Sequence, residues 1–159
     1  MALVHEKLYQ SKDLSNLNLK DYINDLANAV LGSYQLRGDK VSLTVDVDAV
    51  SVAIDTATPC GLIINELMSN SLKHAFPGER RGAVSLVLHQ SEEGEIDLRF
   101  SDNGIGLPEG FDIRNTRSLG LTLVRNLSVT QLKGTIDVRA DHPTEFHIRF
   151  REPLYTRRV

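Results

Sequence analysis

The sequence has little of several features that define whole classes of protein. Its 159 residues include one cysteine, Cys60, which excludes an internal disulfide and a cysteine-rich zinc site. No apolar stretch approaches the ~20 residues that cross a bilayer. Residues 1–13 carry charges early and lack the apolar core of a signal peptide. Secreted, transmembrane and disulfide-rich proteins are therefore disfavoured.

An excess of charge of one sign is also missing. The chain carries 18 Lys and Arg against 21 Asp and Glu, a formal net charge of -3. This balance gives no general reason to expect nucleic acid or an acidic membrane surface as a partner. Hydrophobic residues make up 41% and charged residues 25%, as in soluble globular proteins. The length fits one domain with a sizeable core.

The hydrophobic pattern predicts three helices and five to seven strands. Apolar residues three and four apart predict helices over about 19–32, 55–76 and 118–131. Alternating apolar and polar residues predict strands over 41–47, 50–54, 84–88, 96–100, 136–138 and 146–150. Such alternation leaves one face of the sheet exposed to solvent. This favours antiparallel pairing and disfavours a doubly wound parallel sheet, whose strands are buried on both faces. The expected fold is a two-layer α/β sandwich, with a mixed, mostly antiparallel sheet and three helices on one face.

The second predicted helix has two faces of different character. Pro59 fits its first turn, and one side of it is apolar. The opposite side carries Glu66, Asn70 and Lys73 at i, i+4 and i+7. A solvated face with a favourable Glu–Lys neighbourhood gives the same pattern. However, Asn is a poor residue in mid-helix, and its carboxamide oxygen beside Glu66 favours a hard cation such as Mg²⁺.

A glycine motif directly follows the strand predicted over 96–100. Asp102, Gly104 and Gly106 form the pattern D-x-G-x-G. The two glycines let a flat ligand approach the main chain, and the Asp102 carboxylate can accept a hydrogen bond from an exocyclic amine. The same residues are also good turn formers, so the motif alone leaves both readings open.

A second motif opens the third predicted helix. Ser118, Leu119, Gly120 and Leu121 stand at a loop-to-helix junction, where free backbone N–H groups favour phosphate binding. Ser118 is also a good helix N-cap, which explains part of the motif without a ligand. Neither the G-x-x-x-x-G-K-[ST] phosphate loop nor the G-x-G-x-x-G fingerprint occurs in the chain.

In order and spacing, the three motifs resemble the ATP-binding domain of sensor histidine kinases, in the GHKL ATPase superfamily. NELMSNSLKHAFP resembles the N box, SDNGIGLPEG the first glycine box and RSLGLTLVRNL the second. MALVHEKLYQSKDLSNLNLKDYI is similar to the end of the dimerisation domain in one subclass. The resemblance covers essentially the whole chain. It implies ATP and Mg²⁺ as cofactors, bound between sheet and helices under a flexible lid.

The resemblance also implies a role for each motif residue. In the N box, Asn70 would hold Mg²⁺ on the phosphates, with Glu66 near the metal and its water. Lys73 would contact phosphate and would be catalytic together with Glu66 and Asn70. His74 would lie beside the nucleotide. Asp102 would accept from the adenine amino group. The other expected cofactor-binding residues are Gly104 and Gly106 around adenine, and Ser118, Leu119, Gly120 and Leu121 towards the phosphates.

The sequence departs from the family pattern in four places. Ser118 replaces the usual first glycine of the second box, and Pro143 the usual glycine before the last strand. The phenylalanine box is absent, which leaves residues 109–117 as a short lid. That lid has so little apolar area to bury that we expect it to be mobile without nucleotide. The phosphoacceptor histidine box is missing, and His5 does not match it. Three other histidines lack ligand spacing and are expected to be solvated: His89, His142 and His147.

The resemblance divides the chain into residues 1–18, a remnant of the dimerisation helix and linker; 19–152, the catalytic domain; and 153–159, a tail. The expected function is transfer of the ATP γ-phosphoryl to a histidine on the missing dimerisation domain, so the fragment should not autophosphorylate alone. The expected partners are that domain and a response regulator, in a cytoplasmic homodimeric parent that is soluble or membrane-anchored. Two alternatives stay open: an anti-sigma-type serine kinase and a non-catalytic nucleotide-binding module.

Overall fold

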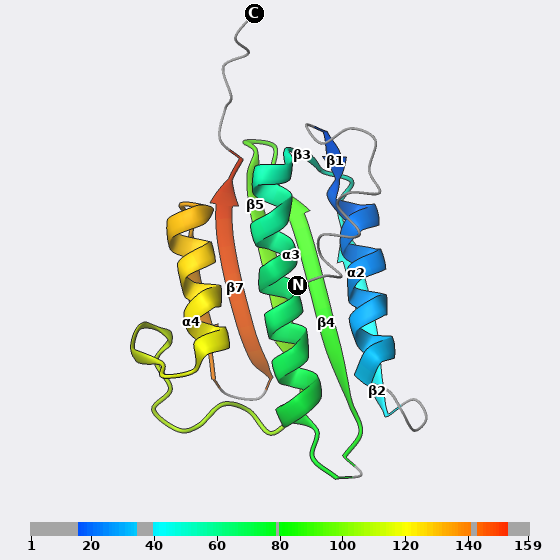
Figure 1. Cartoon of the computed structure of the whole chain (residues 1–159), viewed down its shortest axis with the longest axis vertical. Helices are drawn as coiled ribbons and strands as arrows, with labels where there is room; N and C mark the ends of the chain where they lie inside the picture. Colours follow the sequence, from blue (N-terminus) through cyan, green and yellow to red (C-terminus); the bar gives the residue numbers. More distant parts are fainter. Residues whose placement is uncertain (1–15, 35–39, 79, 141–142, 153–159) are drawn as a thin grey trace, which may run out of the picture.

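Three helices lie side by side on one face of a five-stranded sheet (Figure 1). The computed structural model describes residues 16–34, 40–78, 80–140 and 143–152. The strand order is β2-β4-β5-β7-β6, with β2 and β4 parallel and the other neighbours antiparallel. The strands are β2 (Val41–Val47), β4 (Gly82–Gln90), β5 (Glu95–Asp102), β6 (Thr135–Arg139) and β7 (Thr144–Arg151). The predicted two-layer α/β sandwich with a mostly antiparallel sheet is confirmed.

The predicted helices are confirmed as α2 (Leu19–Tyr34), α3 (Ile54–Asn70) and α4 (Leu119–Asn126). Two of these helices continue as π-helices, which the sequence pattern did not predict: η1 (Ser71–Ala75) follows α3, and η3 (Leu127–Gln131) follows α4. A short 3₁₀-helix, η2 (Ile113–Asn115), precedes α4. None of the helices in the described ranges is long and apolar enough to cross a membrane.

Two boundaries near α3 differ from the prediction. The strand expected over 50–54 is only β3 (Ser51–Val52), which pairs with β1 (Leu17–Asn18). Ile54 is already helical, so Pro59 lies in the second turn of α3, not in the first as predicted. The N-cap residue, Ala53, has no capping side chain, and its N–H instead donates to Glu152 Oε1 at 2.7 Å. A distant carboxylate therefore helps to fix where α3 begins.

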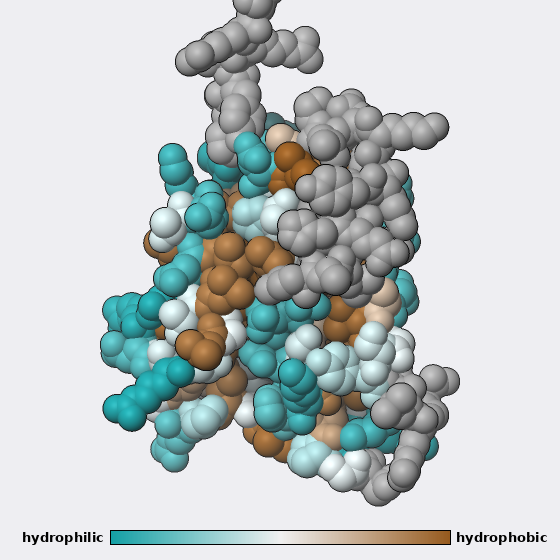
Figure 2. All heavy atoms as spheres, viewed as in Figure 1, coloured by the Kyte–Doolittle hydropathy of each residue, from teal (hydrophilic) through white to brown (hydrophobic). Residues whose placement is uncertain are grey.

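The core lies between α2, α3 and the inner sheet face. The inner positions of the central strands are fully buried: Val84, Leu86 and Leu88; Ile96, Leu98 and Phe100; Phe146, Ile148 and Phe150. The apolar side predicted for α3 is buried against them, including Cys60, where burial raises the pKa of the thiol to about 12. On the helical face, hydrophobic atoms gather between α3 and α4 (Figure 2).

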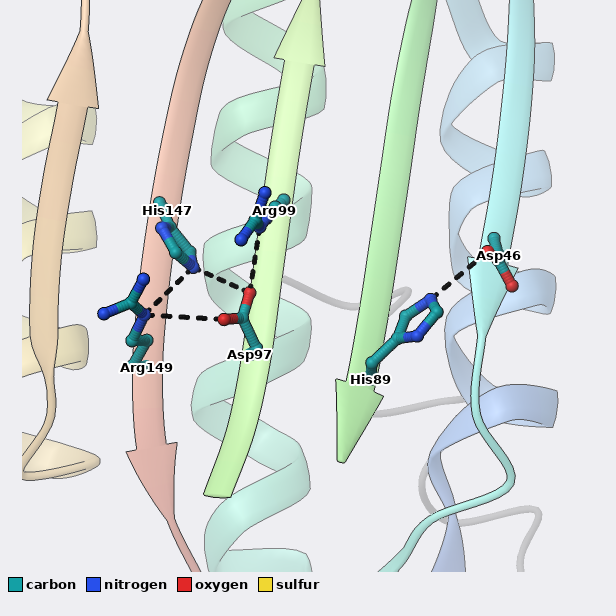
Figure 3. Close-up of polar contacts among 6 residues, drawn as sticks. All are labelled: Asp46, His89, Asp97, Arg99, His147 and Arg149. Carbon is teal, nitrogen blue, oxygen red and sulfur yellow. Dashed lines mark hydrogen bonds and ion pairs between the residues drawn. The ribbon is translucent and has the colours of Figure 1, made fainter. Parts of the chain in front are cut away.

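The outer sheet face is polar and carries two groups of charged side chains (Figure 3). Asp97 lies 2.7 Å from His147 Nε2, 3.2 Å from Arg99 and 3.4 Å from Arg149. Partial burial raises the pKa of the Asp97 carboxyl, but its hydrogen bonds to His147 and Arg99 outweigh this and hold the pKa below its usual value. The His147 side chain is only 14% exposed.

The expectation that His147 is solvated is therefore wrong, because its ring is held by Asp97. The same expectation is confirmed for His89, whose side chain is 51% exposed beside Asp46. His142 lies outside the described residues.

Close packing between α2 and α3 gives a stability prediction. A Cβ atom on Gly61 of α3 would collide with the Tyr22 hydroxyl of α2, whereas one on Gly32 would meet nothing within 4 Å. We expect Gly61→Ala to lower the free energy of unfolding by ~1–3 kcal/mol through overpacking. We expect Gly32→Ala to raise it by up to ~1 kcal/mol, because alanine favours helix. Urea unfolding curves measure both, and equal stability of the two variants would contradict this packing.

Candidate functional site

Four chain segments meet at one end of the molecule, at the bottom of Figure 1. There α3 ends, α4 begins, β5 ends and β7 begins. Between them lies a cavity of about 570 Å³, a size typical of small-molecule sites. Six of the predicted site residues line this cavity: Asn70, His74, Asp102, Gly106, Ser118 and Leu121. The structure thus brings together one part of each of the three sequence motifs.

The rest of the cavity wall is mostly apolar and was not predicted as part of the site. The apolar contributors are Leu67, Ala75, Ile105, Leu107, Pro108 and Phe146, and the polar ones are Ser71 and Thr144. Thr144 lies directly opposite Asp102 in the β5–β7 register, outside the strand predicted over 146–150, so the sequence pattern gave no signal for it. A mostly apolar cavity with a few polar groups suits a flat heteroaromatic ring.

Asp102 supplies the buried charge of the cavity. It is 7% exposed. Its Oδ2 accepts a hydrogen bond from the Ser71 hydroxyl at 2.6 Å, and its Oδ1 accepts from the Gly104 N–H at 3.0 Å. A carboxylate offers about four lone-pair positions, so each oxygen can accept again. This arrangement fixes the carboxylate orientation and leaves it able to receive a ligand N–H group.

Gly104 does not line the cavity, but it lets the loop after β5 pack closely against the end of η1. A Cβ atom there would collide with Ala75 at the end of η1, and the next residue, Ile105, donates its N–H to the Ala75 carbonyl at 2.9 Å. Gly106 has a φ of 85°, a conformation that favours glycine. The two glycines therefore let the loop run against the helix end and then turn along the cavity wall.

The start of α4 packs against the polar face of α3. A Cβ atom on Gly120 would lie 2.7 Å from Glu66 Oε2 and 3.6 Å from Asn70 Nδ2. Ser118 caps the helix by accepting from the Leu121 N–H at 3.3 Å, as the sequence predicts. Glycine at position 120 therefore lets the start of α4 approach the Glu66–Asn70 pair without displacing the Glu66 carboxylate.

The neighbouring side chains of Glu66 and Asn70 fit a Mg²⁺ ion. Mg²⁺ prefers oxygen ligands and takes one or two from protein, keeping the rest for water and phosphate. Asn70 lines the cavity and Glu66 lies one helical turn before it, so one carboxamide and one carboxylate are available as such ligands. Leu119, which the sequence also predicted as a site residue, is 88% exposed and does not line this cavity.

Lys73 lies outside the cavity wall. It belongs to η1, and its Nζ stands 5.9 Å from the centre of the Tyr34 ring at the end of α2. A π-turn accommodates one more residue than an α-turn, so Lys73 departs from the straight stripe of Glu66 and Asn70. The predicted contact between Lys73 and phosphate stays a prediction.

Two protein families match the chain. Residues 55–154 match the family of histidine kinase-, DNA gyrase B- and HSP90-like ATPases. Residues 1–34 match a family described as histidine kinase. The first match contains the residues of all three motifs, and the second overlaps α2.

Known relatives and structures agree with these matches. The sensor histidine kinase PdtaS of Mycobacterium tuberculosis is 33% identical over 87% of this chain, which covers 27% of that relative. The blue-light-activated histidine kinase 2 of Erythrobacter litoralis is 30% identical over 76% of this chain, which covers 36% of that relative. The histidine kinase domain of the Erythrobacter litoralis EL346 kinase has a TM-score of 0.81 and 27% identity, with 94% of this chain and 70% of that one covered. The chain thus spans about a quarter to a third of its curated relatives.

The hydrogen bond between Ser71 and Asp102 gives a prediction about the site. Ser71→Ala leaves one oxygen of a buried carboxylate without its donor, so we expect the free energy of unfolding to fall by ~1–3 kcal/mol. Ser69→Ala, two residues earlier and more exposed, is the control and should stay within ~0.5 kcal/mol of the parent protein. Urea unfolding measures both. A Ser71→Ala protein as stable as the control would show that the hydroxyl does not hold Asp102.

Proposed function

The chain belongs to the histidine kinase-, DNA gyrase B- and HSP90-like ATPase family, and from that premise we propose that it donates the γ-phosphoryl group of ATP to a histidine in a two-component signalling protein. The observation that carries the proposal is the buried Asp102 carboxylate in an apolar cavity, with Asn70 and Gly120 meeting at its edge. The same cavity then offers Asp102 as a partner for adenine, and the junction of Asn70 and Gly120 as a place for phosphate.

Adenine recognition would depend on Asp102. The exocyclic amine of adenine is a donor, and Asp102 is an acceptor already oriented by Ser71 and Gly104. Guanine carries a carbonyl oxygen at the matching ring position, which would face the carboxylate with no hydrogen to share. The apolar wall, with Leu121 and Phe146 among its residues, would cover the ring faces. These features support adenine as the base.

The triphosphate would lie where α3 and α4 meet. Asn70 and Glu66 supply oxygen ligands there for Mg²⁺, which neutralises charge on the phosphates when bound. The backbone N–H groups at the start of α4 are suited to anions. Lys73 would have to leave Tyr34 to reach a phosphate. His74, which lines the cavity, is placed to contact the nucleotide.

The role of this domain in transfer would be positioning. Phosphoryl transfer needs the acceptor nitrogen in line with the γ-phosphate, while the protein orients the groups and excludes water. The expected acceptor is a histidine on the dimerisation domain, and the match of residues 1–34 to a histidine kinase family supports that partner. A response regulator and a homodimeric parent complete the proposed phosphorelay. That same match favours this function over a serine kinase or a non-catalytic module.

Base selectivity is the first test of the proposal. We expect the protein to bind ATP in preference to GTP, and we expect Asp102→Asn to weaken ATP binding by ~1–3 kcal/mol, because a buried acceptor is partly replaced by a donor. Asp97→Asn on the outer sheet face makes the same chemical change far from the cavity and should leave affinity unchanged. Isothermal titration calorimetry measures all three proteins. Equal ATP and GTP affinity would contradict adenine recognition by Asp102.

Transfer itself is the second test. With labelled ATP, Mg²⁺ and a separately supplied dimerisation domain, we expect acid-labile label on that domain and none on this chain incubated alone. Asn70→Asp should cut transfer at least tenfold, because it adds negative charge beside the triphosphate. Asn28→Asp, on the exposed side of α2, is the matched control and should retain transfer. Full transfer by Asn70→Asp would rule out the assigned role, and stoichiometric label on this chain alone would mean that an acceptor histidine lies within it.

A further inference from the structure

The lid between the two glycine motifs is held to α4 over half of its length. Residues 105–108 and Ser118 line the cavity, so residues 109–117 connect two parts of its wall. Ile113 is only 7% exposed, and Phe111 packs against the core. The expectation of a lid that is mobile without nucleotide rested on its small apolar area. It did not count hydrogen bonds from α4 to the lid backbone.

Two side chains of α4 bind that backbone. Arg125 Nη1 donates to the Arg114 carbonyl at 2.7 Å and to the Ile113 carbonyl at 3.3 Å. Thr122 Oγ1 donates to the Thr116 carbonyl at 3.4 Å. The two donors stand three residues apart, so they share one face of α4. Since η2 is a single short turn, its carbonyls gain little from helix bonding and are available to the guanidinium.

The lid also has internal hydrogen bonds, and these involve Arg114, whose carbonyl accepts from Arg125. Asp112 caps η2 by accepting from the Arg114 N–H at 2.9 Å, and its carboxylate pairs with the Arg114 side chain at 3.1 Å. The earlier half has a different character. Gly110 has a φ of 77°, and the backbone bond in residues 109–111 is local, from the Phe111 N–H to the Pro108 carbonyl at 3.1 Å.

We propose that Arg125 is a positioning residue that fixes residues 112–117 on α4 before any nucleotide binds, so that only the glycine-containing half of the lid moves during binding. Arg125 touches no reacting atom. It acts by setting the rim that leads into Ser118 and Gly120, and so reduces the ordering that nucleotide binding must provide. The effect on nucleotide affinity rests on the proposed function, whereas the anchoring of the lid does not.

The anchor is tested by amide hydrogen exchange on the nucleotide-free protein. We expect Arg125→Gln to speed exchange in residues 112–117 about tenfold, which corresponds to ~1.4 kcal/mol of lost hydrogen bonding. Exchange in α3 and β5 should not change. Arg125→Lys should give an intermediate effect, because an ammonium can still reach one carbonyl. Arg139→Gln, an exposed arginine on β6, is the control and should leave the lid as it is.

A second variant covers the case in which Arg125→Gln fails to fold. Thr122→Val is nearly isosteric and removes the other α4 bond, so we expect the same direction of change with a smaller size. Unchanged lid exchange in Arg125→Lys and Thr122→Val would overturn the proposal. A uniform increase across the whole domain in both would also overturn it, because Arg125 would then serve general stability.

Nucleotide titrations separate this proposal from the proposed function. We expect Arg125→Gln to raise the ATP dissociation constant up to tenfold, and ATP to slow lid exchange more in the variant than in the parent protein. If lid exchange rises but ATP affinity is unchanged, the positioning role is overturned. If lid exchange rises but the parent protein binds no ATP, the anchor stands and the proposed function fails.

Discussion

The site depends on one helix that must pack in two directions. The apolar side of α3 is buried against the sheet, while its opposite side presents Glu66 and Asn70 to the start of α4. A Cβ atom at Gly104 would collide with Ala75 at the end of η1, and one at Gly120 would press on the end of the Glu66 side chain. Glycine at these positions lets the loop after β5 and the start of α4 approach the helix formed by α3 and η1, and this packing brings Asp102 and Asn70 to one cavity.

Groups from distant parts of the chain help to fix the two ends of the helix formed by α3 and η1. Glu152, after the last strand, accepts from Ala53 at its start. At the other end, Lys40 Nζ donates to the carbonyls of Phe76 and Gly78, the latter at 2.9 Å. A carboxylate near a helix N-terminus and a cation near its C-terminus both oppose the helix dipole favourably. Two residues that do not line the cavity thus help to set the position of Asn70.

The sequence predicted the features that depend on local pattern. Alternation located the strands, and the spacing of Asn70, Asp102 and Gly120 indicated the site. It could not predict features that depend on contacts between distant residues. The Glu152 cap spans 99 positions, and the π-turn that carries Lys73 towards Tyr34 has no propensity signal. Ser71 was missed because a serine inside a helix reads as neutral until its partner, Asp102, is known.

The central claim is that Asp102 and the α3–α4 junction form two ends of one adenine nucleotide site. A crystal structure of the chain with Mg²⁺ and a non-hydrolysable ATP analogue tests it most directly. The account predicts the adenine amino group within hydrogen-bond distance of Asp102, and the phosphates between Asn70 and Gly120. Nucleotide bound elsewhere, with Asp102 contacting only Ser71 and Gly104 as it does now, would contradict it.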